Sequence, residues 1–97
     1  MVEAQRLAAA VVGGVLAGRS LDAELAAAWR AHGPLDERRR AAAQDLAYGT
    51  LRYLARVESL LEALLVKPLE DARLRALLLV ALHELEHGRA GRPAVVD

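Results

Sequence analysis

The segment between Asp71 and Gly88 has a centre, Ala76–Leu82, that contains no polar residue. The aspartate before the segment, the glycine after it and the leucine spacing within it predict a helix over residues 72–87. Because the centre is apolar on all faces, this helix needs neighbours on every side, as in the middle of a helical bundle. No other feature of the chain constrains the fold as strongly.

The rest of the chain also repeats its apolar residues with helical spacing, and no stretch alternates like a strand. A first helix is expected over about residues 4–17, and Ser20 is placed to cap a second helix. The pair Gly13-Gly14 inside the first helix is unfavourable by about 1 kcal/mol per residue relative to alanine. This cost favours the close approach of a neighbouring helix at the two glycines, with early fraying of the first helix as the alternative.

Gly33-Pro34 is expected to end the second helix, and Asp36 to cap a third. The apolar pattern that follows Asp36 continues to Leu65, which is too long for one ordinary helix. We therefore expect a bend or a break between Gly49 and Glu58.

Three short motifs follow one another along the chain. The run Tyr48-Gly49-Thr50-Leu51-Arg52 lies fifteen residues before Lys67-Pro68-Leu69, and the helical block Leu74–Leu85 comes next. In order and spacing the series resembles the family that joins the transcription antitermination factor NusB to the N-terminal RNA-binding domain of ribosomal-RNA cytosine methyltransferases (Sun/Fmu type). The methyltransferase-attached form is the closer match. The resemblance implies an all-α, NusB-like helical bundle of four to five helices.

The resemblance also carries functional expectations. It implies a non-catalytic module that binds ribosomal RNA, either as the accessory N-terminal domain of an rRNA cytosine methyltransferase or as a stand-alone relative. The alternative is an antitermination module that binds a protein partner as well as RNA. The NusB-like fold normally continues through two further helices. We therefore expect one domain over residues 1–97 that lacks the last helices, with residues 89–97 as a loop or tail.

Charge limits how the chain can bind RNA. With 13 basic and 13 acidic residues the formal net charge is zero, so RNA contacts must come from a local patch. The run Arg38-Arg39-Arg40 lies at a helix start, where cations are unfavourable by roughly 0.3–1 kcal/mol. The run is either a solvated helix start or the sign of an outside demand such as phosphate. Arg6 resembles the arginine that opens the first helix of NusB-like domains. Arg89 and Arg92 complete the expected RNA-binding set.

Other motif residues are expected to serve packing. Gly49 fits a place where a bulky side chain would hold two helices apart. Arg52 matches the family's motif arginine, although an ion pair with Glu84 or Glu86 is an equally good explanation for it. Because the chain has only three aromatic residues, stacking on single-stranded bases is not expected to be the main binding mode. Arginine contacts with the RNA backbone are expected instead.

The stretch His83-Glu84-Leu85-Glu86-His87 satisfies the H-E-x-x-H pattern of zinc hydrolases. Histidines at i and i+4 share a helix face, and the glutamate between them can act as a general base on zinc-bound water. The extended motif needs glycine at position 90 and histidine at position 93, where this chain has Ala90 and Pro93. A zinc hydrolase using His83 and His87 therefore ranks third. We expect no catalytic residue, metal or cofactor, and expect this stretch to reach solvent at the helix end.

The composition also indicates where the protein is found in the cell and whether it forms oligomers. The absence of cysteine excludes a disulfide scaffold and thiolate metal sites. The apolar segment Leu7–Ala17 is shorter than the roughly 20 residues of a membrane span, and Glu3 stands where a signal peptide would be basic. We expect a cytoplasmic protein without membrane contact. Because the all-apolar helix needs partners on every side, we also expect a homodimer or larger assembly.

Overall fold

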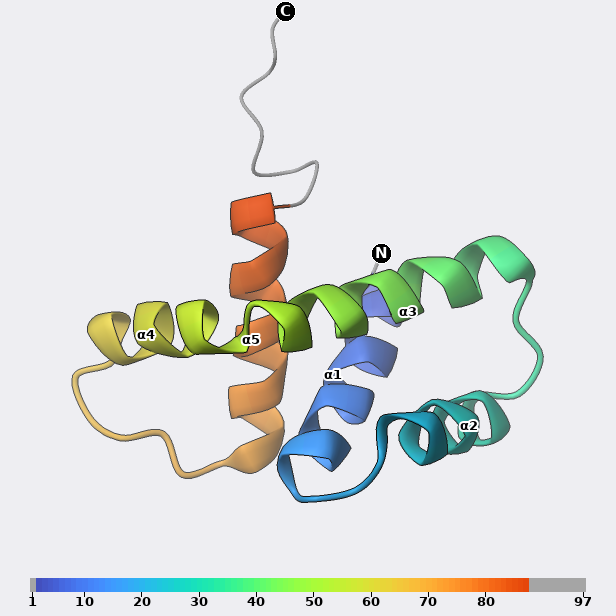
Figure 1. The fold of residues 1–97 in the computed structure, drawn as a ribbon, viewed down its shortest axis with the longest axis horizontal. Coiled ribbons are helices and arrows are strands. Elements are labelled where there is room, and N and C mark those ends of the chain that lie inside the picture. Colours follow the sequence, from blue (N-terminus) through green and yellow to red (C-terminus); the bar gives the residue numbers. More distant parts are fainter. Residues whose placement is uncertain (1, 88–97) are drawn as a thin grey trace, which may run out of the picture.

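The computed structural model describes residues 2–87, which form five helices and, over that range, no strand (Figure 1). The helices are, in order, α1 (Val2–Leu16), α2 (Leu21–His32), α3 (Glu37–Arg52), α4 (Leu54–Leu64) and α5 (Ala72–His87). The expected all-α fold is confirmed, and α5 has the predicted bounds. The predicted loop or tail over residues 89–97 lies outside the described residues.

Side-chain oxygens cap three of the helices as the sequence predicts. Ser20 accepts a hydrogen bond from the backbone N–H three residues ahead at 3.1 Å, Asp36 does so at 2.8 Å and Asp71 at 3.1 Å. These caps satisfy backbone donors that the first turn of a helix leaves without partners. Gly33 ends α2 with a φ of 91°, a conformation that glycine adopts without the steric cost of a Cβ atom.

The long apolar pattern after Asp36 is broken at Tyr53, inside the predicted interval. Tyr53 leaves helical geometry (φ −107°, ψ 29°), while its N–H still bonds to the carbonyl of Gly49 at 3.1 Å. One residue later α4 begins, and in Figure 1 it continues α3 toward the left of the view. Buried Thr50 is satisfied locally, because its hydroxyl donates to the carbonyl of Leu46 at 2.7 Å.

The helix at the centre of the packing is α1, which contacts α2, α3 and α5. Its side chains Ala8, Val11 and Val12 are at most 1% exposed and lie in the larger of two core clusters. The predicted close approach at the glycine pair is confirmed. A Cβ atom on Gly13 would lie in ordinary contact with Cβ of Ala76, at 3.5 Å, so α5 crosses α1 there.

The prediction that α5 has neighbours on every side is met only in part by the described residues. α5 packs against α1, α3 and α4, and its Leu79 forms a second core cluster with Val57 and Leu61 of α4. The remaining face is uncovered: Leu74 is 43% exposed and Leu85 is 60% exposed. The apolar composition of this helix therefore exceeds what residues 2–87 can cover.

Candidate nucleic-acid interface

The start of α1, the end of α2 and the start of α3 meet at one end of the molecule. Glu3 joins them: one carboxylate oxygen pairs with Nε2 of His32 at 2.7 Å, and the other lies 3.6 Å from a guanidinium nitrogen of Arg39. Arg6 lies one turn along α1 and lines a shallow hollow together with Glu3 and His32. The structure thus brings Arg6 to the same end as the arginines of α3, and we call Arg6, Arg38, Arg39 and Arg40 the arginine cluster.

The three arginines at the start of α3 differ in their partners. Arg39 is tied to Glu3 and also lies 4.0 Å from Asp36, so its charge is partly compensated. The guanidinium of Arg40 lies over the ring of Trp29, 5.7 Å from the centroid, where the face of the indole attracts a cation. Arg38 is exposed and, within residues 2–87, has no ion-pair partner. Arg38 and Arg40 therefore keep charge available for an outside anion.

The backbone reinforces this electrostatic arrangement. Both α1 and α3 begin at this end, and each helix start carries about half a positive charge. Guanidinium groups beside such ends suit phosphate oxygens, which accept two parallel hydrogen bonds from one arginine. The carboxylates nearby, including Glu3 and Asp36, limit the net field. The cluster offers donors for a few phosphate groups at most, and it does not form an extended basic surface.

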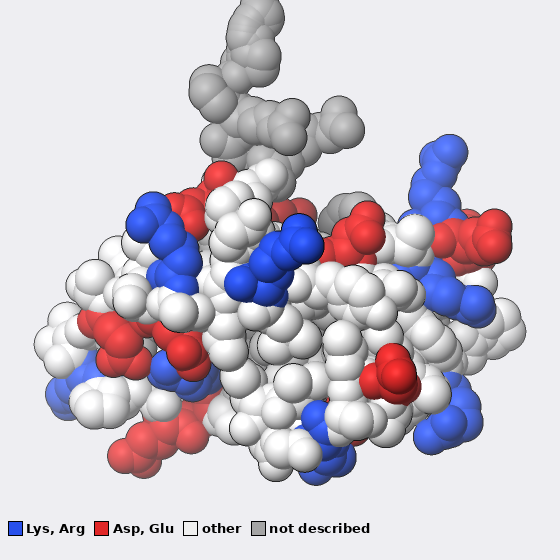
Figure 2. All heavy atoms as spheres, viewed as in Figure 1, with Lys and Arg blue, Asp and Glu red and all other residues white. Residues whose placement is uncertain are grey.

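Charge over the molecule is mixed in the same way. Figure 2 shows Lys and Arg side chains interspersed with acidic ones on the face in view, without one continuous basic surface. This pattern agrees with the formal net charge of zero. Binding to nucleic acid would therefore depend on particular arginines and would not come from a general attraction.

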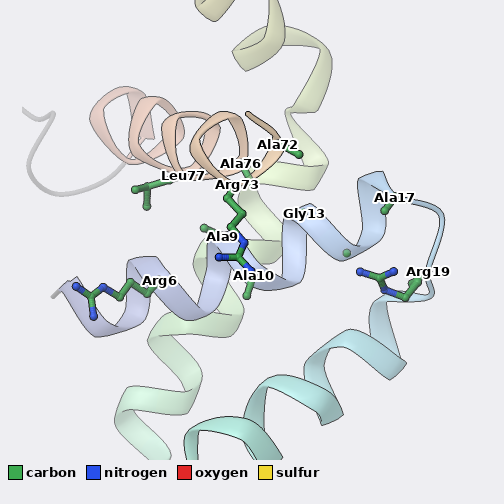
Figure 3. A pocket seen from close by; sticks show the side chains of 11 residues that line it. Arg6, Ala9, Ala10, Gly13, Ala17, Arg19, Ala72, Arg73, Ala76 and Leu77 are labelled. Carbon is green, nitrogen blue, oxygen red and sulfur yellow. The ribbon is translucent and has the colours of Figure 1, made fainter. Parts of the chain in front are cut away.

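A groove between α1 and α5 was not predicted from the sequence. It has a volume of about 550 Å³, a floor of small residues around Ala10 and Gly13, and Arg6 and Arg73 on its walls. Figure 3 shows Arg73 reaching from α5 across α1, between Arg6 and Arg19. Arg19 is compensated by Glu24 at 3.0 Å. Only the glycine pair signalled the close approach; nothing in the sequence joined Arg6 to Arg73.

One expectation about the arginines is not tested by the described residues, and another is wrong. Arg89 and Arg92 fall outside the described residues. The proposed ion pair of Arg52 with Glu84 or Glu86 is wrong, because Glu86 instead pairs with Arg56 at 2.6 Å. Glu84 accepts a hydrogen bond from Gln5 of α1. The break at Tyr53 explains the error: it changes the helical register, so that Arg56 of α4 meets the end of α5.

The H-E-x-x-H stretch reaches solvent only in part: Leu85 and His87 are exposed as expected, but His83 is not. His83 is only 8% exposed, and its ring faces Gly49 of α3. The ring of Tyr53 stacks on His87 at a centroid distance of 4.5 Å and on His83 at 5.9 Å. Among residues 2–87 no group of three or more potential ligand side chains could hold a metal ion. The two histidines, His83 and His87, serve packing between α3, α4 and α5.

We expect this packing to make stability depend on pH. Burial lowers the pKa of His83, and the nearby His87 lowers it further, against smaller opposing effects of Glu86 and Glu84. Nδ1 of His83 is buried without a hydrogen-bond partner, so a proton there would find no acceptor. Because the folded-state pKa lies below the unfolded value of about 6.5, the stability is complete above that pH and is lost as pH falls through the folded-state pKa.

Urea denaturation followed by circular dichroism over this pH range would measure the effect. Replacement of His83 by Gln removes the titrating group and should flatten the dependence of the unfolding free energy on pH below about 6.5. Replacement of the exposed His32 by Gln is the control and should leave most of that dependence in place. An unchanged slope in the His83 variant would show that another group causes it.

Every helix between residues 2 and 87 falls short of the length and apolar character that crossing a bilayer requires.

Comparison with known proteins extends these observations. Residues 2–97 match the NusB family. The chain is 42% identical, over 98 aligned residues, to the N-terminal region of the ribosomal RNA small subunit methyltransferase B of Pseudomonas putida (strain KT2440). The alignment covers 99% of this chain and 21% of that relative, so the chain spans about a fifth of the relative's length. No solved structure gives a significant match.

Proposed function

We propose that this chain, which belongs to the NusB family, is a non-catalytic RNA-binding module that acts on ribosomal RNA. The observation that carries the proposal is that Glu3 links the first turns of α1, which carry Arg6, to Arg39 at the start of α3. The name of the Pseudomonas relative supplies the class of RNA, the RNA of the small ribosomal subunit. A protein with this role would work in the cytoplasm. Any methyl transfer would be carried out by a domain that these residues do not include.

Binding in this proposal is by contact with phosphates. Arg6, Arg38 and Arg40 each offer a forked set of donors, and Arg39 can exchange its carboxylate partners for phosphate. The available aromatic surface is small: Tyr48 and Tyr53 are 43% and 42% exposed and lie away from the cluster, in and after the last turn of α3. We therefore assign positioning on the RNA backbone to the arginine cluster and do not assign reading of single bases to aromatic residues.

A salt titration tests the proposal. Three or four phosphate contacts should give a slope of about −2 to −4 in a plot of log affinity against log salt concentration, measured with small-subunit ribosomal RNA. Joint replacement of Arg38, Arg39 and Arg40 by Ala should flatten this slope and weaken binding by about tenfold or more, because counterion release is lost. Arg6→Ala should act in the same direction with a smaller effect.

The matched control is Lys67→Ala, which removes one exposed cation from the α4–α5 connection. It should change the slope less than Arg6→Ala does. A random duplex of equal length should bind more weakly than the ribosomal RNA. An unchanged titration for the triple replacement would exclude the start of α3 from the interface, and equal effects of Lys67→Ala and Arg6→Ala would reduce the interaction to net charge.

A further inference from the structure

Glu3 divides its carboxylate between two cationic side chains from different helices. One oxygen lies 2.7 Å from Nε2 of His32 in the last turn of α2, and the other lies 3.6 Å from a guanidinium nitrogen of Arg39 in α3. Because an ionised carboxylate only accepts hydrogen bonds, Nε2 of His32 carries a proton and donates to Glu3. Glu3 therefore engages Arg39 in the way that a phosphate oxygen of RNA would.

The charges around His32 balance one another while its imidazole is neutral. Arg6 lines the same shallow hollow as Glu3 and His32, and Asp36 lies 4.0 Å from Arg39, so two guanidinium groups face two carboxylates. Because Nε2 of His32 already bears a proton, a second proton adds at Nδ1 and gives this group of side chains an excess positive charge. Histidine changes its charge between about pH 5 and 8, which makes the balance sensitive to mild acid.

The contact between Glu3 and Arg39 can be exchanged without disturbing the core. The side chain of Glu3 is 41% exposed and that of Arg39 is 65% exposed, so water reaches both partners. Ion pairs between exposed groups contribute little to stability. A phosphate group in RNA offers a guanidinium two charged oxygens, as a carboxylate does. Exchange of Glu3 for phosphate at Arg39 therefore leaves the fold intact.

On the basis of the proposed RNA-binding function, we propose that Glu3 is an intramolecular competitor of RNA phosphate for Arg39, and that protonation of His32 relieves this competition. Protonated His32 adds a cation beside Arg6 and holds the carboxylate of Glu3 at α2, which leaves Arg39 free for phosphate. The affinity for RNA should therefore rise as the pH falls from about 8 to about 6.

Fluorescence anisotropy with a small-subunit ribosomal RNA fragment, at about 50 mM salt and at about pH 8 and pH 6, would measure this effect. Glu3→Gln should raise the affinity at pH 8 about threefold or more, since one phosphate contact changes the salt slope by about 0.9. It should also reduce the gain between pH 8 and pH 6.

The matched control is Glu37→Gln, which removes an exposed carboxylate from the first turn of α3. Within residues 2–87 Glu37 has no ion-pair partner, so its replacement should raise the affinity less than Glu3→Gln does. His32→Gln should keep the affinity at pH 6 close to its value at pH 8. Circular dichroism at both pH values confirms that each variant remains folded.

A second measurement separates the competition by Glu3 from RNA binding itself. Sulfate is the probe, because it resembles phosphate and keeps its charge between pH 6 and 8, and the Cζ NMR signal of Arg39 reports its binding. At about pH 8 sulfate should shift this signal at about threefold lower concentration in Glu3→Gln than in the wild type.

The outcomes distinguish the two proposals. Equal sulfate binding in wild type and Glu3→Gln, equal effects of Glu3→Gln and Glu37→Gln on RNA affinity, or a His32→Gln chain that keeps the full pH dependence would each overturn the competition while RNA binding stands. A sulfate difference in a wild-type chain that binds no RNA at either pH would overturn the proposed function and leave the contact of Glu3 with Arg39 as a general anion gate.

Discussion

Replacement of Gly49 by Leu should lower the free energy of unfolding by about 3 kcal/mol, because no space exists for a side chain between α3 and α5. A Cβ atom at this position would lie 2.9 Å from Cε1 of His83 and closer still to its Nε2, distances that Cβ atoms do not adopt in proteins. His83 is buried and stacks with Tyr53, so its ring cannot move aside without opening the contact between α3, α4 and α5. Urea denaturation followed by circular dichroism would measure the loss.

Gly13→Ala is the matched control, because it also adds a Cβ atom to a helical glycine at a helix crossing. There the new atom would meet Cβ of Ala76 at 3.5 Å, an ordinary contact, and helix propensity should stabilise the variant by up to about 1 kcal/mol. Adding His83→Ala to Gly49→Leu should recover part of the loss, since the clash is removed. Equal effects of substitution at Gly49 and Gly13 would show that the close approach to His83 is absent in solution.

Replacement of Leu79 by Ala should lower the free energy of unfolding by about 3 kcal/mol or more. Leu79 is fully buried and forms the core between α4 and α5 with Val57 and Leu61. Because the truncation leaves a cavity, the loss is a large share of the 5–15 kcal/mol that stabilises a typical domain. The thermal unfolding midpoint should fall by several degrees or more.

Leu64→Ala is the corresponding control in the same region, since Leu64 of α4 is 68% exposed. Its effect on the unfolding free energy should stay below about 1 kcal/mol. A comparable loss in the two variants would mean that α4 does not pack on α5 through the cluster around Leu79.

Local sequence signals predicted the helices well, because caps and breaks are set by residues close together in the chain. Ser20, Asp36 and Asp71 cap helices as expected, and the break at Tyr53 falls within the expected interval. The surroundings of α5 were predicted only in part. An apolar centre shows that a helix needs partners, but whether these come from the same molecule depends on the tertiary packing. The small residues and Gly13 let α1 take the central place.

The candidate site could be predicted only in part. The run at the start of α3 stands out by its sequence, and Arg6 by resemblance, but their proximity depends on Glu3, which joins His32 and Arg39 across three helices. No spacing in the sequence encodes that link. The partner of Glu86 was also missed, because the break at Tyr53 decides which of two arginines in neighbouring turns faces α5.

Amide chemical-shift mapping by NMR tests most directly whether RNA binds where the starts of α1 and α3 lie together. On titration with a small-subunit ribosomal RNA fragment, the largest shifts should fall around Arg6 and over Arg38–Arg40, and they should fade as salt is raised. The amides of α4 should change little. Shifts concentrated on α4, or no shifts at concentrations where the RNA is bound, would contradict the proposed interface.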